Sequence, residues 1–107
     1  MYKRRAHVVF LHEQHPEIAA RAVALAEQSG GEWLEARHDY LDQNWPDLLI
    51  LLDGRQPDKL KLPKHMRGKS WPLGSDWETD LQRRIAGMIG GFRMLARLDD
   101  SAAPRKA

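Results

Sequence analysis

Apolar positions along the chain fall either in short continuous runs or in longer stretches with helical spacing. Residues 8–11 and 48–52 are apolar at consecutive positions, and such runs are typical of strands covered on both faces in a parallel sheet. Between them, apolar residues of the stretch 18–26 recur at three- and four-residue steps. Pro16 suits the first turn of that helix, because its missing N–H is not needed there. The pattern therefore predicts a strand, a helix and a further buried strand in the first half of the chain.

Weaker sequence patterns predict the remaining strands of the sheet. Residues 33–36 predict a short strand after the double glycine at 30–31, which we expect to end the preceding helix in a left-handed conformation. Residues 69–73 predict another strand, and Pro72 favours an edge position for it. The lysine-rich stretch 55–68 contains two prolines and is interpreted as a surface connection. The sheet is thus predicted to hold three or four strands.

The last third of the chain carries the clearest helix signal. Residues 75–78 read Ser-Asp-Trp-Glu, a capping box in which each end satisfies a free backbone donor of the other. Apolar residues then recur at helical spacing: Trp77, Leu81, Ile85, Met88, Phe92 and Leu95. A helix over 76–98 would be about 34 Å long, whereas a five-residue strand reaches only about 17 Å. We therefore expect part of the apolar surface beyond the sheet to be exposed, among Met88, Phe92, Met94, Leu95 and Leu98.

Glycines interrupt this helix at positions 87, 90 and 91, and each costs about 1 kcal/mol relative to alanine. That cost predicts close backbone packing there, either against the sheet or against a second copy of the chain. The four-residue spacing of Gly87 and Gly91 would allow a tight helix crossing. A homodimer through this helix is our hypothesis, with an interface formed by Gly87, Gly91, Phe92 and Leu95.

The order of elements is strand, helix, strand, strand, possible strand and helix. This order favours a small three-layer α/β sandwich with a mostly parallel sheet of three or four strands and a long C-terminal helix. The length of 107 residues fits one domain. We assign that domain to residues 1–98 and interpret residues 99–107 as a flexible C-terminal tail.

Composition excludes several classes of function. The chain has no cysteine, which excludes disulfides, thiolate metal sites and cysteine nucleophiles. A formal net charge of +2 is too small to indicate a nucleic-acid-binding surface. The basic run has no interleaved aromatic platform and is interpreted as a solvated face: Lys59, Lys61, Lys64, Arg67 and Lys69. The longest apolar run is too short to span a bilayer and no secretory signal is recognisable, so we predict a cytoplasmic protein without a membrane partner.

Three segments, taken in order, resemble the low-molecular-weight protein tyrosine phosphatase and arsenate reductase superfamily. They are the opening strand "VVFLH" with its loop and alanine-rich helix, the central strand "DLLILLD", and the closing segment "GKSWPLGSDWETDLQRRIAGMI". The resemblance implies a flavodoxin-like fold of the phosphotyrosine protein phosphatase I-like type. It also implies a phosphate-binding loop after the first strand, and phosphatase or arsenate reductase activity.

The chain departs from this family at the residues that carry the family's chemistry. On the simplest alignment, the nucleophilic cysteine falls on His12 and the phosphate-clamping arginine falls on Ile18. Glu13 adds a negative charge that would repel a bound anion by about 1 kcal/mol at 4 Å even in water. The family's general acid, an aspartate followed by proline, falls near Asp76, which is followed here by Trp77. Without a nucleophile the family's covalent mechanism cannot operate, so we lean away from an enzyme.

The loop after the first strand holds the densest set of candidate ligands in the chain: His12, Glu13, Gln14, His15 and Glu17. A loop at a helix N-terminus can bind a small anion through its backbone N–H groups. His12 and His15, with the two carboxylates, could instead supply ligands to a metal ion such as zinc. The structural alternative is that His15 caps the helix and Glu17 favours the positive end of its dipole. We favour capping, and predict neither a metal nor a cofactor.

Trp45 and Trp71 each stand beside a proline, and are candidates for a pocket rim or for cover of the sheet edges. Our functional hypothesis is a catalytically degenerate phosphatase-like protein that serves as a binding or regulatory module. Its partner would be another protein or a small anionic ligand. Two alternatives stay open: an active enzyme with a site rearranged around His12 or Asp76, and a metal-binding protein that uses His12 and His15.

Overall fold

The computed structural model describes residues 5–38 and 44–102, with side chains as far as residue 95. The chain forms, in order, β1 (Ala6–Leu11), α1 (Pro16–Gly30), β2 (Leu34–Arg37), β3 (Leu48–Leu51), the short 3-10 helix η1 (Pro57–Lys59), β4 (Arg67–Ser70) and α2 (Trp77–Ala102). Strand β4 begins at Arg67 rather than at residue 69, and α2 continues past residue 98, its predicted end. Residues 103–107 of the predicted tail lie outside the described residues.

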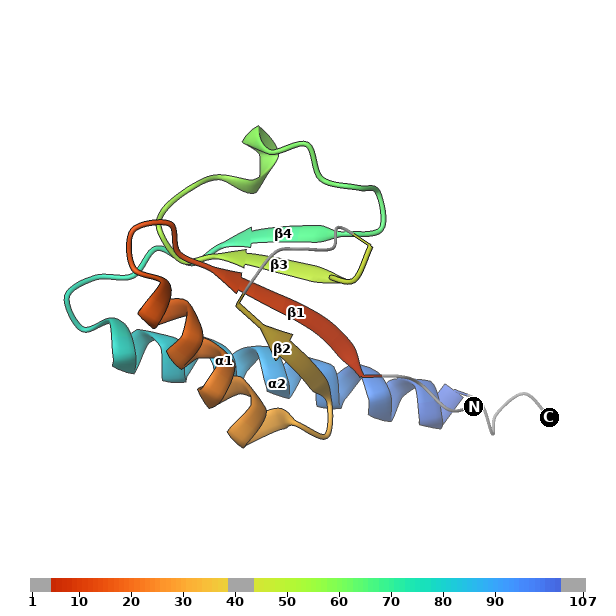
Figure 1. Ribbon diagram of the computed structural model, residues 1–107. Coiled ribbons are helices and arrows are strands. Elements are labelled where there is room, and N and C mark those ends of the chain that lie inside the picture. The colour runs from red at the N-terminus through yellow and green to blue at the C-terminus, as the bar shows by residue number, and fades with distance from the viewer. Residues whose placement is uncertain (1–4, 39–43, 103–107) are drawn as a thin grey trace.

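The four strands pair in parallel in the order β2-β1-β3-β4 (Figure 1). The α/β class, the parallel sheet and the long last helix are as the sequence predicts, and the strand order is that of flavodoxin-like folds. The chain leaves β1 toward one edge, and returns across the sheet to β3 and β4. Because connections between parallel strands are right-handed, connections that run in opposite directions lie on opposite faces of the sheet. This rule places α1 on one face and the β3–β4 connection on the other.

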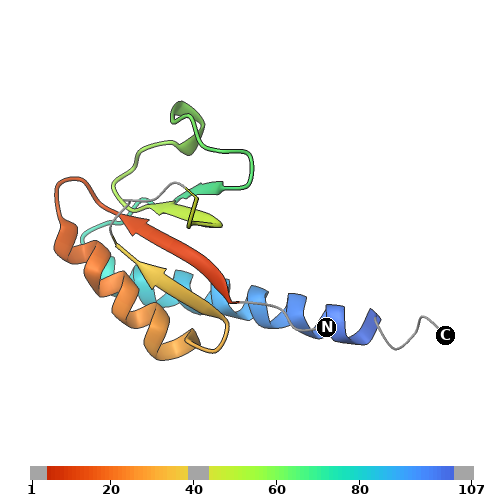
Figure 2. The same cartoon turned by 45° about the vertical axis from the view of Figure 1, so that its right-hand side comes forward.

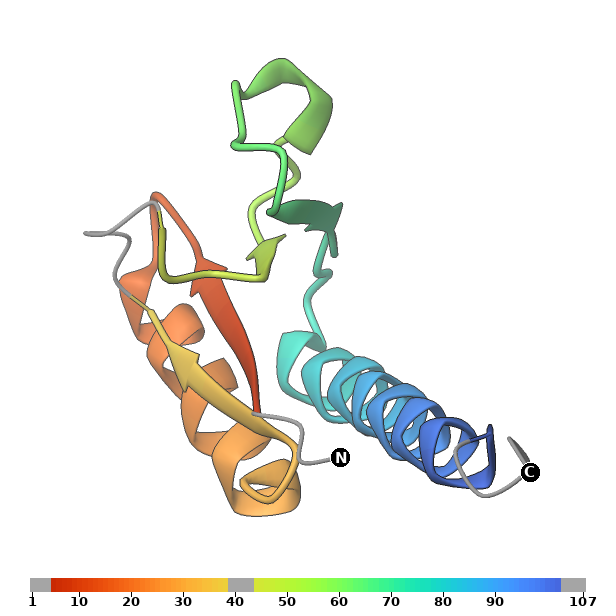
Figure 3. The same cartoon turned by 90° about the vertical axis from the view of Figure 1, so that its right-hand side faces the viewer.

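Both helices pack on one face of the sheet (Figure 3). Side chains from alternate strand positions meet apolar residues of both helices in one core: Val8, Phe10, Leu34, Ile50 and Leu52 with Ile18, Ala22, Leu81, Ile85 and Ile89. Strands β1 and β3 are also buried on their second face, as their continuous apolar runs predict. The second half of α2 extends beyond the strands (Figure 2), and Met94 and Leu95 there are 62% and 59% exposed, which confirms the expected exposure.

The second face of the sheet is covered by the segment between β3 and β4. Leu60, Leu62 and Met66 of this segment pack against Val9, Leu49 and Leu51. Interpreting residues 55–68 as a mere surface connection was therefore wrong, because their sparse apolar residues form the third layer of the domain.

Two predictions about helix ends are corrected by the structure. Helix α1 stops at the double glycine, but Gly31 has φ −58° and ψ −20°, a right-handed rather than a left-handed conformation. Gly30 is needed for a different reason, since a Cβ atom there would lie 2.6 Å from Cδ1 of Ile89 on α2. The predicted capping box also fails within the described residues, because the carboxylate of Glu78 bonds to Arg21 of α1 at 2.8 Å instead of turning back to Ser75.

Candidate functional site

The loops after β1 and β3 meet at the carboxyl end of the sheet. In flavodoxin-like folds this is the point where successive connections leave in opposite directions, and where ligands usually bind. The backbone N–H of Leu52 donates to the carbonyl of Leu11 at 2.9 Å and so prolongs the pairing of the two strands. One residue later, the backbone N–H of Glu13 donates to Oδ2 of Asp53 at 2.8 Å. Asp53 therefore joins the predicted anion loop to the neighbouring loop.

Asp53 is itself held by Arg55. The guanidinium Nε lies 2.9 Å from Oδ2, and the backbone N–H of Arg55 donates to Oδ1 at 3.3 Å. The Asp53 side chain is only 2% exposed. Burial raises the pKa of this carboxyl, but the hydrogen bonds from Arg55 and from the Glu13 amide, with the charge of Arg55, outweigh burial and hold the pKa below its ordinary value. At neutral pH the loop thus contains an ionised carboxylate supplied by the chain.

The histidines of the loop are engaged with its own atoms. The backbone N–H of His15 donates to Nδ1 of His12 at 3.1 Å, so His12 carries its proton on Nε2 when neutral. The two rings make an edge contact with centroids 5.2 Å apart, and Nδ1 of His15 lies 3.2 Å from a carboxylate oxygen of Glu17. His15 occupies the N-cap position of α1, but its side chain makes no capping hydrogen bond. The predicted capping is therefore corrected: His12 supports the turn, and His15 pairs with Glu17.

The remaining predicted residues of this site are dispersed. Glu13 and Gln14 direct exposed side chains away from the core, whereas Ile18, on the position of the family's arginine, is 8% exposed and packs in the core. Asp76 is exposed, and its carbonyl accepts the N–H of Asp80 at 3.1 Å at the start of α2. Among the described residues, no three His, Asp or Glu side chains converge as a metal site would require.

A groove of about 830 Å³ lies along β4 and the amino ends of β1 and β3 on one side, and along α2 from Arg84 to Leu95 on the other. Ala6 and Leu48 open β1 and β3 and form part of its wall, and Trp71 after β4 completes that side. Trp71 is 8% exposed and packs on Phe10. Sequence reasoning missed this groove, because it depends on where α2 lies relative to the strands.

One face of α2 supplies the opposite wall of the groove. Its residues stand at three- and four-residue steps: Arg84, Gly87, Met88, Gly91, Phe92 and Leu95. A different face of the same helix carries Leu81, Ile85 and Ile89 into the core. The apolar stripe that the sequence presents as continuous is thus divided between the core and the groove. All four residues of the hypothetical dimer interface line the groove.

Three cations stand around the groove. Arg67 and Lys69 alternate along β4, which places both side chains on the helix-bearing face, and Arg84 projects from α2 with its guanidinium carbon 5.9 Å from the Trp71 ring centre. Within the described parts of the chain, these three cations have no ion-pair partner. Arg67 and Lys69 stand two residues apart, as side chains on one face of a strand do. This spacing could have distinguished them in the sequence from the solvated lysines.

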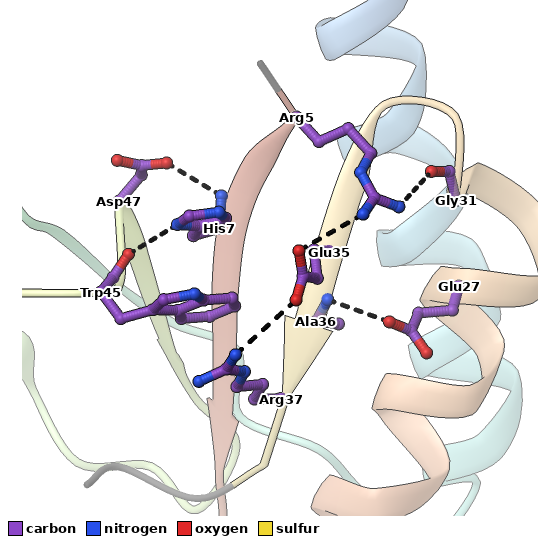
Figure 4. Close-up of polar contacts among 9 residues, drawn as sticks. All are labelled: Arg5, His7, Glu27, Gly31, Glu35, Ala36, Arg37, Trp45 and Asp47. Carbon is purple, nitrogen blue, oxygen red and sulfur yellow. Dashed lines mark hydrogen bonds and ion pairs between the residues drawn. The ribbon is translucent and has the colours of Figure 1, made fainter. Parts of the chain in front are cut away.

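Trp45 lies on the opposite face of the sheet and does not line this groove. Its ring stacks on His7 with centroids 4.1 Å apart and planes within 3°, and the guanidinium carbon of Arg37 lies 4.1 Å from the ring centre. Figure 4 shows the indole between these two groups. Nδ1 of His7 is 2.9 Å from the Trp45 carbonyl, and Arg37 pairs with Glu35 at 3.7 Å. Trp45 therefore covers strands β1 and β2, and only Trp71 of the two lines the groove.

No family model matches this chain, and no curated protein shows significant similarity to it. As far as the described residues extend, neither helix has the length and apolar composition needed to cross a lipid bilayer.

Proposed function

We propose that this protein is a noncatalytic relative of the low-molecular-weight tyrosine phosphatases that acts as a binding or regulatory module. The observation that carries the proposal is the hydrogen bond from the Glu13 amide to the carboxylate of Asp53. At the place where the family's loop would hold a phosphate, this chain holds an anion of its own. The family assignment is supported by the three resembling segments and by the strand order.

The chemistry of the loop supports a structural role. Catalysis by the family mechanism needs a nucleophile and a cation aimed at the phosphate oxygens. Here the cysteine position is His12, whose Nδ1 accepts a backbone hydrogen bond, and the arginine position is the buried Ile18. The guanidinium of Arg55, in the neighbouring loop, is bound to Asp53. An entering phosphate dianion would meet two carboxylates, those of Glu13 and Asp53.

Assays of p-nitrophenyl phosphate hydrolysis and of arsenate reduction test this proposal. We expect no turnover by the purified chain above that of its His12→Ala variant. Since His12 is the residue on the nucleophile position, turnover that is abolished by His12→Ala would contradict the proposal. Glu32→Ala serves as a matched control for substitution at an exposed site away from the loop.

A binding measurement completes the test, because an inactive loop could still capture phosphate. Titration with inorganic phosphate, followed through the backbone amide resonances of residues 12–17, should give no saturable shifts. Saturation at millimolar phosphate, with the Glu13 amide shifting most, would show that the loop is open to anions and that Asp53 does not close it.

A further inference from the structure

The glycines of α2 have no packing reason within the described structure. A Cβ atom added at Gly87, Gly90 or Gly91 would meet no atom within 4 Å. Each glycine nevertheless costs the helix about 1 kcal/mol relative to alanine. The predicted close packing against the sheet is therefore wrong. Two of these glycines instead form part of the groove wall. Gly87 and Gly91 line it, whereas Gly90 does not, so their missing side chains keep that wall open.

The groove is apolar on its inner walls. Trp71 and Leu48 form the sheet side, and Met88 and Phe92, both half-buried, form the helix side. Its volume of about 830 Å³ is in the range of small-molecule sites, which are mostly apolar with a few placed polar groups. These walls would bury an alkyl chain and release the water that covers them.

The polar groups around the groove are predominantly cationic. Arg67, Lys69 and Arg84 have no ion-pair partner in the described chain, and His65 adds a basic side chain. Among the described residues that line the groove, the single carboxylate is that of Asp47, whose Oδ2 already accepts the backbone N–H of His7 at 2.8 Å. An anionic head group would therefore find uncompensated positive charge beside an apolar cleft.

We propose that this groove binds a free anionic amphiphile, a medium-length alkyl chain that ends in a carboxylate. The chain lies between Trp71 and Phe92, and the carboxylate is held by Arg67 and Lys69 at the groove mouth. This inference rests on the proposed role as a binding module and names its ligand class. It does not depend on the state of the loop at the carboxyl end of the sheet.

Calorimetric titration with decanoate, below the concentration at which it forms micelles, tests the inference on the intact chain. We expect saturable binding of one decanoate, and little binding of acetate, which has the charge without the alkyl chain. Arg67→Gln should weaken decanoate binding about tenfold through loss of one charged hydrogen bond. The same variant should leave the affinity for decanol unchanged. Lys61→Gln is the control for loss of an exposed cation outside the groove.

A pair of glycine variants locates the site. Gly87→Leu fills the groove wall, whereas Gly90→Leu makes the same change of helix propensity outside the groove. Both should fold, because the space beside each glycine is open and leucine favours the helix. Gly87→Leu should lose at least about tenfold in decanoate affinity, a change of roughly 1.4 kcal/mol. Gly90→Leu should bind decanoate with the affinity of the unmodified chain. Gly91→Leu provides a second groove variant if Gly87→Leu does not fold.

Several outcomes would overturn the inference. The first is the absence of saturable decanoate binding. The second is an equal affinity of Gly87→Leu and Gly90→Leu for decanoate, and the third is an equal affinity of the unmodified chain for decanoate and acetate. Sedimentation that shows a dimer dissociated by Gly87→Leu, without decanoate binding, would assign the groove to a second copy of the chain instead. Phosphatase turnover would contradict the noncatalytic role without touching these results, so the two proposals fail separately.

Discussion

At the carboxyl end of the sheet, Asp53 accepts hydrogen bonds from the amide of Glu13 and from Arg55, and the loop histidines bond within their own turn. In the groove between β4 and α2, Arg67, Lys69 and Arg84 surround apolar walls without ion-pair partners in the described chain. The first region has the sequence features of a ligand loop, yet its polar groups satisfy one another. The second has no recognisable motif, yet its charges and apolar walls lack partners. We therefore expect a ligand in the groove rather than at the loop.

The largest effect is expected where the polar groups are mutually satisfied. Asp53→Ala should lower the free energy of unfolding by about 2 kcal/mol or more, because it leaves two backbone donors and a guanidinium without their acceptor in a partly buried place. Asp58→Ala, which removes an exposed carboxylate on η1, is the matched control. Urea denaturation of both variants gives the comparison. Equal losses in the two would show that Asp53 does not hold the loops together.

The glycines distinguish packing from an open surface. Gly30→Ala should destabilise the fold by about 1–3 kcal/mol, since the new Cβ would overlap Ile89 at 2.6 Å. Gly90→Ala should stabilise it by up to about 1 kcal/mol, because the helix gains propensity and the added methyl group meets nothing. Thermal unfolding measures both. A destabilised Gly90→Ala would mean that α2 is packed there in solution, which would favour self-association through this helix.

The pH dependence of stability isolates the Asp53 carboxylate. Its pKa is lowered in the folded state from the ordinary value of 3.8, so its stabilising effect is complete above that value. The effect is lost as the pH falls below 3.8 and through the folded-state pKa. The stability difference between the unmodified chain and Asp53→Asn should therefore be constant near neutral pH and shrink as the pH falls below 3.8. Urea denaturation midpoints of both proteins, measured from pH 6 down to pH 3, give this stability difference. A difference that grows as the pH falls would contradict the prediction.

Much of the fold was predictable, because it depends on local signals. Continuous apolar runs identified β1 and β3 as strands buried on both faces, and helical spacing identified α1 and α2. The third layer was missed because Leu60, Leu62 and Met66 have no regular period in the sequence. An irregular segment can cover a sheet face without showing the periodic apolar spacing by which strands and helices are recognised.

The candidate site was less predictable, for two physical reasons. Asp53 follows the third strand, and its contact with the Glu13 amide depends on β1 and β3 being neighbours, which no local pattern reports. The groove depends on the position of α2 relative to β4, which is a tertiary property. Sequence reasoning did identify the glycines as costly and assigned that cost to close packing against the sheet or a second copy, and the structure leaves the space beside Gly87 and Gly91 open within one chain.

The smallest expected effect concerns the ion pair between Arg21 and Glu78, which joins the two helices near the carboxyl end of the sheet. The guanidinium makes two hydrogen bonds to one carboxylate oxygen, at 3.0 and 2.8 Å, but the two side chains are 44% and 47% exposed. Solvent screens such a pair, so Arg21→Gln should cost only about 0.2–1 kcal/mol, and less in high salt. Arg83→Gln, at an exposed position of α2, controls for the general loss of a positive charge.

A double-mutant cycle tests whether the Arg21–Glu78 ion pair is coupled to the contacts of Asp53. If Arg21→Gln and Asp53→Ala have additive effects, the helix pair and the loop bridge are independent, as separated sites generally are. We expect additivity, because no hydrogen bond or ion pair within the described chain connects Glu78 to Asp53 or Arg55, and the Arg21 pair is about half exposed. A coupling above about 0.5 kcal/mol in this double-mutant cycle would instead show that the polar contacts at the carboxyl end act as one network. In that case closure of the loop would depend on the docking of α2, and changes in the groove wall would reach the loop through the same helix.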